Sequence, residues 1–205
     1  MSNEQHLESL SEIKEIMTRS SRFMSLSGIA GILAGIFALM GAFLAYRSVY
    51  QNQDYMAYRK ATITFDSLAQ LLAIGAVVLV LSIGSGIYFS YRKAQKNGEV
   101  FWNEQANLVL INLMIPLGTG GILCLILLIK GYIGVVAPLT LIFYGLALVN
   151  ASKYTLTEIR SLGIMEIIVG LIAMEFIGYG LIFWAVGFGL LHIIYGSYMY
   201  FKHES

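Results

Sequence analysis

The stretch FMSLSGIAGILAGIFALMGAFLAY, residues 23–46, decides the fold of this chain because it contains no charged residue. Arg22 and Arg47 bracket these 24 residues. A helix of that length extends over about 30 Å, which is the thickness of the hydrocarbon core of a bilayer. We therefore interpret residues 23–46 as a transmembrane helix.

Five more apolar stretches follow. Three are uncharged over 25, 25 and 22 residues, between Asp66 and Arg92, Glu104 and Lys130, and Lys130 and Lys153. The fifth carries Glu166 and Glu175, and the sixth carries His192. The pattern predicts an all-α membrane protein, a bundle of six transmembrane helices arranged as three hairpins.

Composition supports one membrane domain. Hydrophobic residues make up 58% of the chain and charged residues 12%, about half the charged share of a soluble domain. We expect a cytoplasmic amphipathic helix at 1–22, where Ser9 and Glu12 have the spacing of a capping box, followed by a six-span transmembrane domain at 23–205. The net charge of +1 gives no indication of nucleic-acid binding.

The distribution of basic residues predicts the orientation. If the N-terminus is cytoplasmic, the cytoplasmic segments are 1–22, 92–104, 151–160 and 202–205. They hold nine of the thirteen basic residues: Lys14, Arg19, Arg22, Arg92, Lys93, Lys96, Lys153, Arg160 and Lys202. The positive-inside rule then places both termini in the cytoplasm of a multi-pass inner-membrane protein.

The first and fifth apolar stretches are alike. GIAGILAGIFALM begins at Gly28 and GIMEIIVGLIAME begins at Gly163, so that Gly28 coincides with Gly163 and Gly35 with Gly170. Both stretches are expected to cross the membrane in the same direction. The likeness indicates a parallel internal repeat, with similar hairpins placed around an axis normal to the membrane.

Small residues at a spacing of four predict close helix packing. In the first stretch these are Ser27, Gly31 and Gly35; Gly163 and Gly170 are the corresponding candidates in the fifth. Small side chains let helix backbones approach where lipid provides no hydrophobic drive.

Pro116 lies near the middle of the third stretch and predicts a kink or a break. The freed carbonyl needs a protein or water partner at membrane depth. Two interpretations stay open: a functional hinge, and a kink that only shapes the bundle.

A buried polar seam is the candidate site. Counted along straight helices from the cytoplasmic end, Glu166 lies about 8 Å and His192 about 14 Å inside the membrane. Tyr195 is nearer the depth of Glu166 and one turn from His192, so the three could share a seam, and Asn112 and Asn150 could face it. A charge inside the bilayer is costly and is retained where it has a partner or a function. A carboxylate beside an imidazole can relay protons or hold a cation; the alternative is a structural hydrogen-bond clamp.

Catalytic motifs are weak. The sequence has no metal-ligand spacing, no phosphate-binding glycine loop and no nucleophile with a base nearby. We expect no cofactor and no metal, and enzymatic activity stays open.

The stretch YGLALVNASKYTLTEIRSLGIMEIIVGLIAMEFIGYGLIFWAVGFGLLHIIYGSYMYFKHE, residues 144–204, resembles a family of small uncharacterised bacterial membrane proteins. The paired glycine-rich hairpins are also similar to the HdeD-like six-span proteins linked to acid resistance. These resemblances imply a bacterial inner membrane and supply neither a substrate nor a mechanism.

Three function classes follow. The first is an interaction or stress-related membrane protein that packs against lipids, a membrane protein partner or further copies of itself. The second is a small transporter or channel that uses the Glu166–His192 seam. The third is an intramembrane enzyme.

Overall fold

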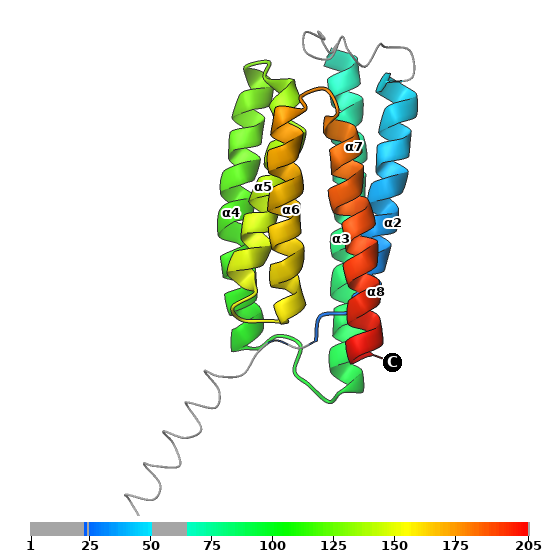
Figure 1. Ribbon diagram of the computed structural model, residues 1–205. Coiled ribbons are helices and arrows are strands. Elements are labelled where there is room, and N and C mark those ends of the chain that lie inside the picture. The colour runs from blue at the N-terminus through cyan, green and yellow to red at the C-terminus, as the bar shows by residue number, and fades with distance from the viewer. Residues whose placement is uncertain (1–22, 24, 51–64, 205) are drawn as a thin grey trace, which may run out of the picture.

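Six helical rods run side by side through residues 23, 25–50 and 65–204, the part of the chain that the computed structural model describes (Figure 1). They are α2 (Gly28–Ala45), extended by the short η1 (Tyr46–Tyr50); α3 (Phe65–Lys96); α4 (Glu104–Ile129); α5 (Val136–Ala151), preceded by η3 (Ile133–Val135); α6 (Thr157–Glu175); and a last rod composed of α7 (Gly180–Trp184), η4 (Ala185–Leu191) and α8 (His192–His203). The all-helical prediction is confirmed for this part. The helix predicted at 1–22 lies outside it.

Five of the described helices are long and apolar enough to cross a membrane. They are Gly28–Ser48, Asp66–Lys96, Glu104–Ile129, Ile133–Ala151 and Gly180–His203. The sixth predicted span, α6, is 19 residues long but carries four charged side chains: Glu158, Arg160, Glu166 and Glu175. Its length fits a bilayer, but its four charges fall within 18 consecutive residues, whereas each of the other five has a stretch of that length with at most two.

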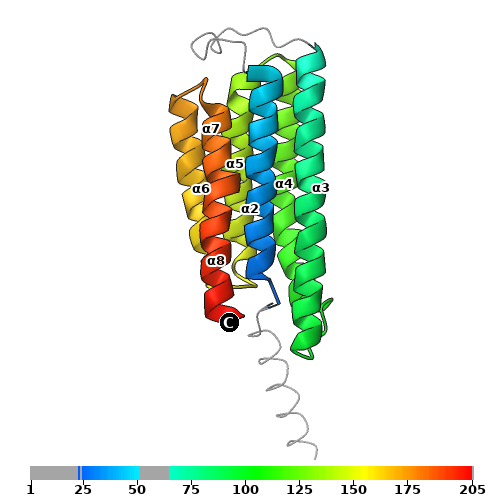
Figure 2. The same ribbon diagram turned by 90° about the vertical axis from the view of Figure 1, so that its right-hand side faces the viewer.

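The rods form two layers of three. One layer contains α4, α5 and α6, and the other contains α3, α2 and the last rod (Figures 1 and 2). Within the layers, α5 packs against α4 and α6, and α2 packs against α3 and α8. Close backbone contact between the layers is made by the last rod, which meets α5 and α6. The last rod is thus shared between its own layer and α6, rather than paired with α6 alone.

Glycines make two close helix crossings. A Cβ on Gly28 of α2 would lie 2.5 Å from the carbonyl oxygen of Gly196 of α8. A Cβ on Gly163 of α6 would lie 2.7 Å from the carbonyl oxygen of Gly145 of α5. At both crossings the backbones are in contact, so any larger residue would force the helices apart.

Gly31 and Gly35 of the predicted packing face lie against the last rod. A Cβ on Gly31 would be 3.1 Å from Gly196 Cα, and one on Gly35 would be 2.6 Å from Gly189 O. Ser27, just before α2, is buried and its backbone N–H donates to Ser90 Oγ of α3. The small-residue face is therefore used, with α8 as its main partner.

Helix α4 continues through Pro116 without a break. Proline has no N–H, so the carbonyl of Asn112, four residues earlier, loses its helical donor. The side-chain amide of Asn150 on α5 donates to that oxygen at 3.0 Å. Proline and asparagine together thus join α4 to α5 at the position where a hinge or a kink was expected.

The start of α2 and the end of α8 lie at the same end of the bundle. The backbone N–H of Gly28 donates to Oε1 of Glu204 at 2.6 Å. Before α2, Phe23 N donates to Tyr154 O at 2.8 Å and Thr155 Oγ1 donates to Phe23 O at 2.6 Å. This end therefore ties the chain before α2 to the α5–α6 connection.

Candidate functional site

Glu166 lies in the middle of α6 on the face that packs against α5. Gly163 and Gly170, about one turn away on either side, let α5 come close: added Cβ atoms would lie 2.7 Å from Gly145 O and 2.7 Å from Ile142 Cγ1. The side chain between them is enclosed, and Glu166 is 0% exposed. The glycines of this crossing therefore bury the carboxyl group that the sequence singled out.

His192 comes from the last rod, at the junction of η4 and α8. Its Nδ1 lies 3.4 Å from Oε1 of Glu166 and 3.1 Å from the carbonyl oxygen of Gly187. The residue is 7% exposed. A carboxyl group and an imidazole thus meet where the two layers touch.

Tyr144 of α5 completes the cluster. Its phenolic oxygen lies 2.8 Å from Nε2 of His192, and its ring stacks on the imidazole with centroids 5.4 Å apart. Phe188 of η4 packs against both rings, at 5.0 Å from Tyr144 and 6.0 Å from His192. Three elements, α5, α6 and the last rod, each contribute one polar group to a chain of Glu166, His192 and Tyr144.

The segment directly before His192 is a π-helix, η4. π-Helical turns widen the backbone and are frequent at functional sites. Gly187 within it faces Glu166: a Cβ there would be 2.5 Å from Oε2 of Glu166 and 2.4 Å from Cδ2 of Leu141. The missing side chain makes the space that the carboxyl group fills.

Neither carboxyl oxygen of Glu166 accepts a hydrogen bond from any residue that the structure describes. A buried carboxylate without donors is strongly disfavoured unless it is protonated or faces a cation. His192 is the one described ionisable group that forms an ion-pair contact with it. The pair can exist as carboxylate with imidazolium, or as carboxylic acid with neutral imidazole, and both forms have no net charge. Loss of one proton leaves the pair with a charge of −1, and gain of one proton leaves it with +1.

Tyr195, which the depth count placed near Glu166, makes no hydrogen bond to it, since neither carboxyl oxygen of Glu166 has a hydrogen-bond partner among the described residues. Like Tyr144, it packs against the apolar cluster of Leu148, Leu162 and Leu191. The tyrosine hydroxyl that meets His192 is that of Tyr144. Asn112 and Asn150 lie between α4 and α5, at the Pro116 crossing, and bond to backbone carbonyls rather than to Glu166.

Sequence reasoning missed Tyr144 as a site residue although one signal was present. Tyr144-Gly145 repeats the dipeptide Tyr195-Gly196, and both glycines make helix crossings. A tyrosine directly before a crossing glycine is held near the neighbouring helix. Only the packing of α5 on α6 distinguishes which of the two tyrosines reaches His192.

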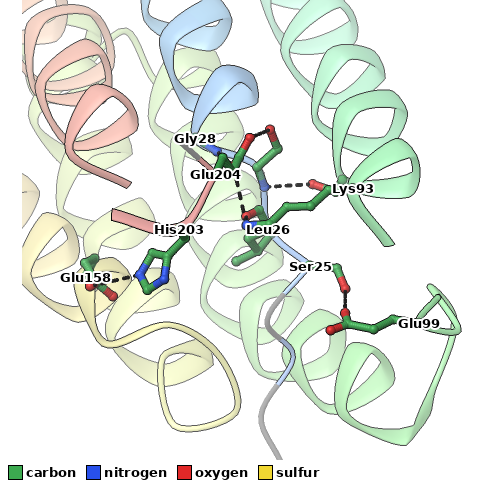
Figure 3. Close-up of polar contacts among 10 residues, drawn as sticks. Ser25, Leu26, Gly28, Lys93, Glu99, Glu158, His203 and Glu204 are labelled. Carbon is green, nitrogen blue, oxygen red and sulfur yellow. Dashed lines mark hydrogen bonds and ion pairs between the residues drawn. The ribbon is translucent and has the colours of Figure 1, made fainter. Parts of the chain in front are cut away.

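A second polar cluster, the C-terminal clasp, lies at the end of the bundle where α2 begins and α8 ends. We define it as Glu158, Lys202, His203, Glu204, Lys93 and the backbone of residues 26–28. Figure 3 labels its side chains except that of Lys202. Glu204 accepts from Gly28 N at 2.6 Å, from Ser27 Oγ at 3.2 Å and from Lys93 Nζ at 3.4 Å. Lys93 also donates to Leu26 O at 2.8 Å.

The other half of the clasp is centred on Glu158 in the first turn of α6. Lys202 Nζ donates to its Oε1, and His203 Nε2 lies 3.3 Å from the same oxygen. Burial alone would raise the pKa of Glu158, but hydrogen bonds from Lys202, from its own backbone N–H and from His203 outweigh it and hold the pKa at about 2, below the ordinary 4.5. Glu158 is therefore ionised at neutral pH and ties α6 to α8.

No group of three or more His, Cys, Asp or Glu side chains within the described ranges could hold a metal ion. Cys124, the one cysteine of the sequence, is buried in α4 as a free thiol. Comparison with known proteins gives no match: no family model, no curated protein and no solved structure is similar to this chain. The function is therefore argued from the site itself.

Proposed function

We propose that this chain is a six-span membrane protein of the bacterial inner membrane, with both termini in the cytoplasm. Five apolar helices support the placement in a membrane. For α6, Glu158 and Arg160 lie at one end and Glu175 at the other, and the central Glu166 is enclosed by protein. Such a helix can span a bilayer because its terminal charges reach the interfaces.

The proposed orientation rests on charge. Within the described ranges, six basic residues lie at the end of the bundle where α2 begins: Arg92, Lys93, Lys96, Lys153, Arg160 and Lys202. Only Arg47 and Lys130 lie at the opposite end of this part. The positive-inside rule assigns the richer end to the cytoplasm.

We further propose that the protein binds and releases a proton at Glu166, His192 and Tyr144, and that this step changes the contact between the two helix layers, as in a small proton-coupled transporter. The observation that carries the proposal is the burial of both Glu166 oxygens without a hydrogen-bond donor among the described residues. A purely structural clamp would satisfy both oxygens, because an unmade bond at a buried polar atom costs about 1–3 kcal/mol. The described ionisable group in ion-pair contact with Glu166 is His192, whose Nδ1 must carry a hydrogen because it also bonds to the carbonyl oxygen of Gly187. The nitrogen that can accept, Nε2, faces the Tyr144 hydroxyl instead.

Geometry supports the coupling. Glu166 belongs to α6 and Tyr144 to α5, whereas His192 belongs to the opposite layer. Adding or removing one proton changes the charge in this contact, and a buried charge is costly unless it is paired. The two protonation states therefore favour different separations of the layers, which is the condition for a ligand or proton to shift a conformational equilibrium.

Trp184 offers a local test, because its ring lies 5.0 Å from Phe188, which in turn packs on His192. In a Trp102→Phe background, Trp184 is the single tryptophan. Its fluorescence should titrate with pH in the purified protein, and the transition should be lost in Glu166→Gln or His192→Asn. Glu175→Gln, the same change at the exposed end of the same helix, is the matched control and should keep it. A transition that survives Glu166→Gln removes the proposal.

A second candidate function, binding of another membrane helix, has its own observation. No residue in the most apolar window of α3 is buried, and Cβ atoms at Gly75, Gly84 and Gly86 would meet nothing within 4 Å. Exposed glycines let a second helix approach closely. Gly84→Cys in a Cys124→Ala background should cross-link to a partner in native membranes; the absence of any cross-linked species would assign this face to lipid.

We also propose that the two glycine crossings descend from an internal repeat. The crossings correspond in register. Gly28 and Gly35 of α2 meet Gly196 and Ile193 of the last rod, just as Gly163 and Gly170 of α6 meet Gly145 and Ile142 of α5. Both residues of α2 lie 135 positions before their counterparts in α6 (163 − 28 and 170 − 35), and both residues of the last rod lie 51 positions after their counterparts in α5 (196 − 145 and 193 − 142). Glu166 falls where the other crossing has Gly31, so the proposed site occupies one crossing and not its counterpart.

A further inference from the structure

An apolar groove lies on the opposite side of η4 from Glu166. It is a cavity of about 390 Å³ between the outer half of α2 and the last rod. One wall is formed by Leu39 and Ala42 of α2 and by Tyr46 of η1. The other wall includes Ile182, Val186 and Leu190 of the last rod. Apart from tyrosine hydroxyls, the side chains that line it are hydrocarbon, so its occupant must be hydrocarbon as well.

The position of the groove identifies a source for that hydrocarbon. It extends from Leu39 to Tyr46, about 10 Å along α2, and it lies at the end of the bundle away from the C-terminal clasp. Its rim is open, since Ile182 and Leu190 are half exposed. In the proposed membrane placement this rim faces the acyl chains of the outer leaflet.

A charged side chain that does not itself line the cavity lies near the outer end of the groove. Arg47 directly follows the lining residue Tyr46, is exposed, and lies over the Phe43 ring with its guanidinium carbon 5.8 Å from the centroid. Tyr46 and Tyr179 line the cavity close to this end. A guanidinium and phenols at the level of the headgroups match a phosphate above an acyl chain.

We infer that the groove binds one acyl chain of a phospholipid, with the phosphate at Arg47, and that its occupancy acts on the Glu166–His192 site through η4. The inference rests on the proposed function for its membrane placement and for the titration of that site. Val186 lines the groove, and its neighbour Gly187 lies against Glu166, so a single π-helical turn contacts both the groove and the carboxyl group. Leu39 also presses on this turn, since a Cβ at Gly189 would be 2.4 Å from its Cδ2.

Native mass spectrometry of the full chain, purified in detergent with added phosphatidylglycerol, tests the binding. The wild-type protein should retain lipid, and Ala42→Phe, which fills the groove, should lose it. Met40→Phe is the matched control: it makes the same new side chain two residues away on the exposed side of α2, and it should retain lipid as the wild type does. Equal retention by Ala42→Phe and the wild type overturns the groove as the site.

Arg47→Gln provides a variant that leaves the core untouched. It should weaken retention of phosphatidylglycerol with little change in the unfolding temperature, because besides the proposed contact with the phosphate it removes a cation–π contact with the exposed Phe43 ring. Unchanged retention in this variant overturns the assignment of the headgroup. A change of oligomeric state in Ala42→Phe, in place of a loss of lipid, shows that the groove holds a second copy of the chain and also overturns the inference.

The coupling is read from the Trp184 titration with and without phosphatidylglycerol. Lipid should displace the midpoint of the transition in the wild type and leave the midpoint of Ala42→Phe unchanged. If the transition is present but lipid does not move it, the coupling fails and the proposed function stands. If neither the wild type nor any variant shows a transition, the proposed function fails. Retention of lipid then still shows whether the groove is a lipid-binding site.

Discussion

Gly187 lies directly against the carboxyl group of Glu166, so that a Cβ at position 187 would be 2.5 Å from Oε2. Leu141, on the other side, would be 2.4 Å from the same Cβ, and both Leu141 and Glu166 are fully buried. The substitution Gly187→Ala must therefore move the carboxyl group relative to His192. We expect it to destabilise the protein by about 1–3 kcal/mol and to change the pH dependence of Trp184 fluorescence. Gly86→Ala, whose Cβ meets nothing, is the control and should leave that pH dependence unchanged.

The hydrogen bond from Asn150 to the carbonyl of Asn112 should matter only because Pro116 leaves that carbonyl free. Asn150→Leu is expected to cost about 1 kcal/mol, the upper part of the range for side-chain bonds between membrane helices. In a Pro116→Leu background the backbone N–H of residue 116 can reach Asn112, so the same substitution should cost clearly less. A thermodynamic cycle of the four proteins in detergent measures the difference. An equal cost in both backgrounds would show that proline and asparagine are not linked.

The two glycine crossings should respond alike to an added methyl group. Gly28→Ala places it 2.4 Å from Tyr200 N, and Gly163→Ala places it 2.7 Å from Gly145 O. Backbone atoms cannot move aside as flexible side chains do, so each variant should unfold at a lower temperature than the wild type. Gly84→Ala, with open space at its Cβ, should be neutral or stabilising because alanine is the better helix former. Opposite effects at the two crossings would contradict their equivalence.

The clasp predicts a pH dependence with a definite sign. The folded pKa of Glu158, about 2, lies below the ordinary 4.5, so its ionisation stabilises the fold above pH about 4.5, and this contribution is lost as the pH falls toward about 2. Lys202→Gln removes the strongest donor to Glu158. It should lower the unfolding temperature at neutral pH and converge with the wild type as the pH is lowered through that window. A constant difference across the window would remove Glu158 as the cause.

Much of the fold follows from the sequence, and the reasons are local. Uncharged stretches of bilayer length are helices in the structure, because a helix satisfies its backbone hydrogen bonds within one segment. The small residues at 31 and 35 mark a packing face because small side chains allow contact. The partner of that face could not be predicted: spacing indicates that a helix is close, and only tertiary packing selects α8 rather than α3.

The candidate site was also only partly predictable from the sequence. Depth along a straight helix placed Glu166 about 8 Å and His192 about 14 Å inside the membrane, with Tyr195 nearer the depth of Glu166. In the structure, Nδ1 of His192 lies 3.4 Å from Oε1 of Glu166. Depth does not determine direction, and η4 interrupts the regular helix just before His192. A π-turn changes the rotation of the residues on either side of it. Tyr144, from a different helix, reaches the imidazole, and Tyr195 packs, like Tyr144, against the Leu148–Leu162–Leu191 cluster.

The central claim is that Glu166 takes up and loses a proton inside the bundle. Infrared difference spectra of the protein in lipid, recorded between alkaline and acidic pH, detect the C=O stretch of a carboxylic acid directly. We predict a band, shifted by its apolar surroundings, that appears on acidification, is absent in Glu166→Gln and is present in Glu175→Gln. A spectrum in which Glu166→Gln removes no carboxylic acid band would contradict the account.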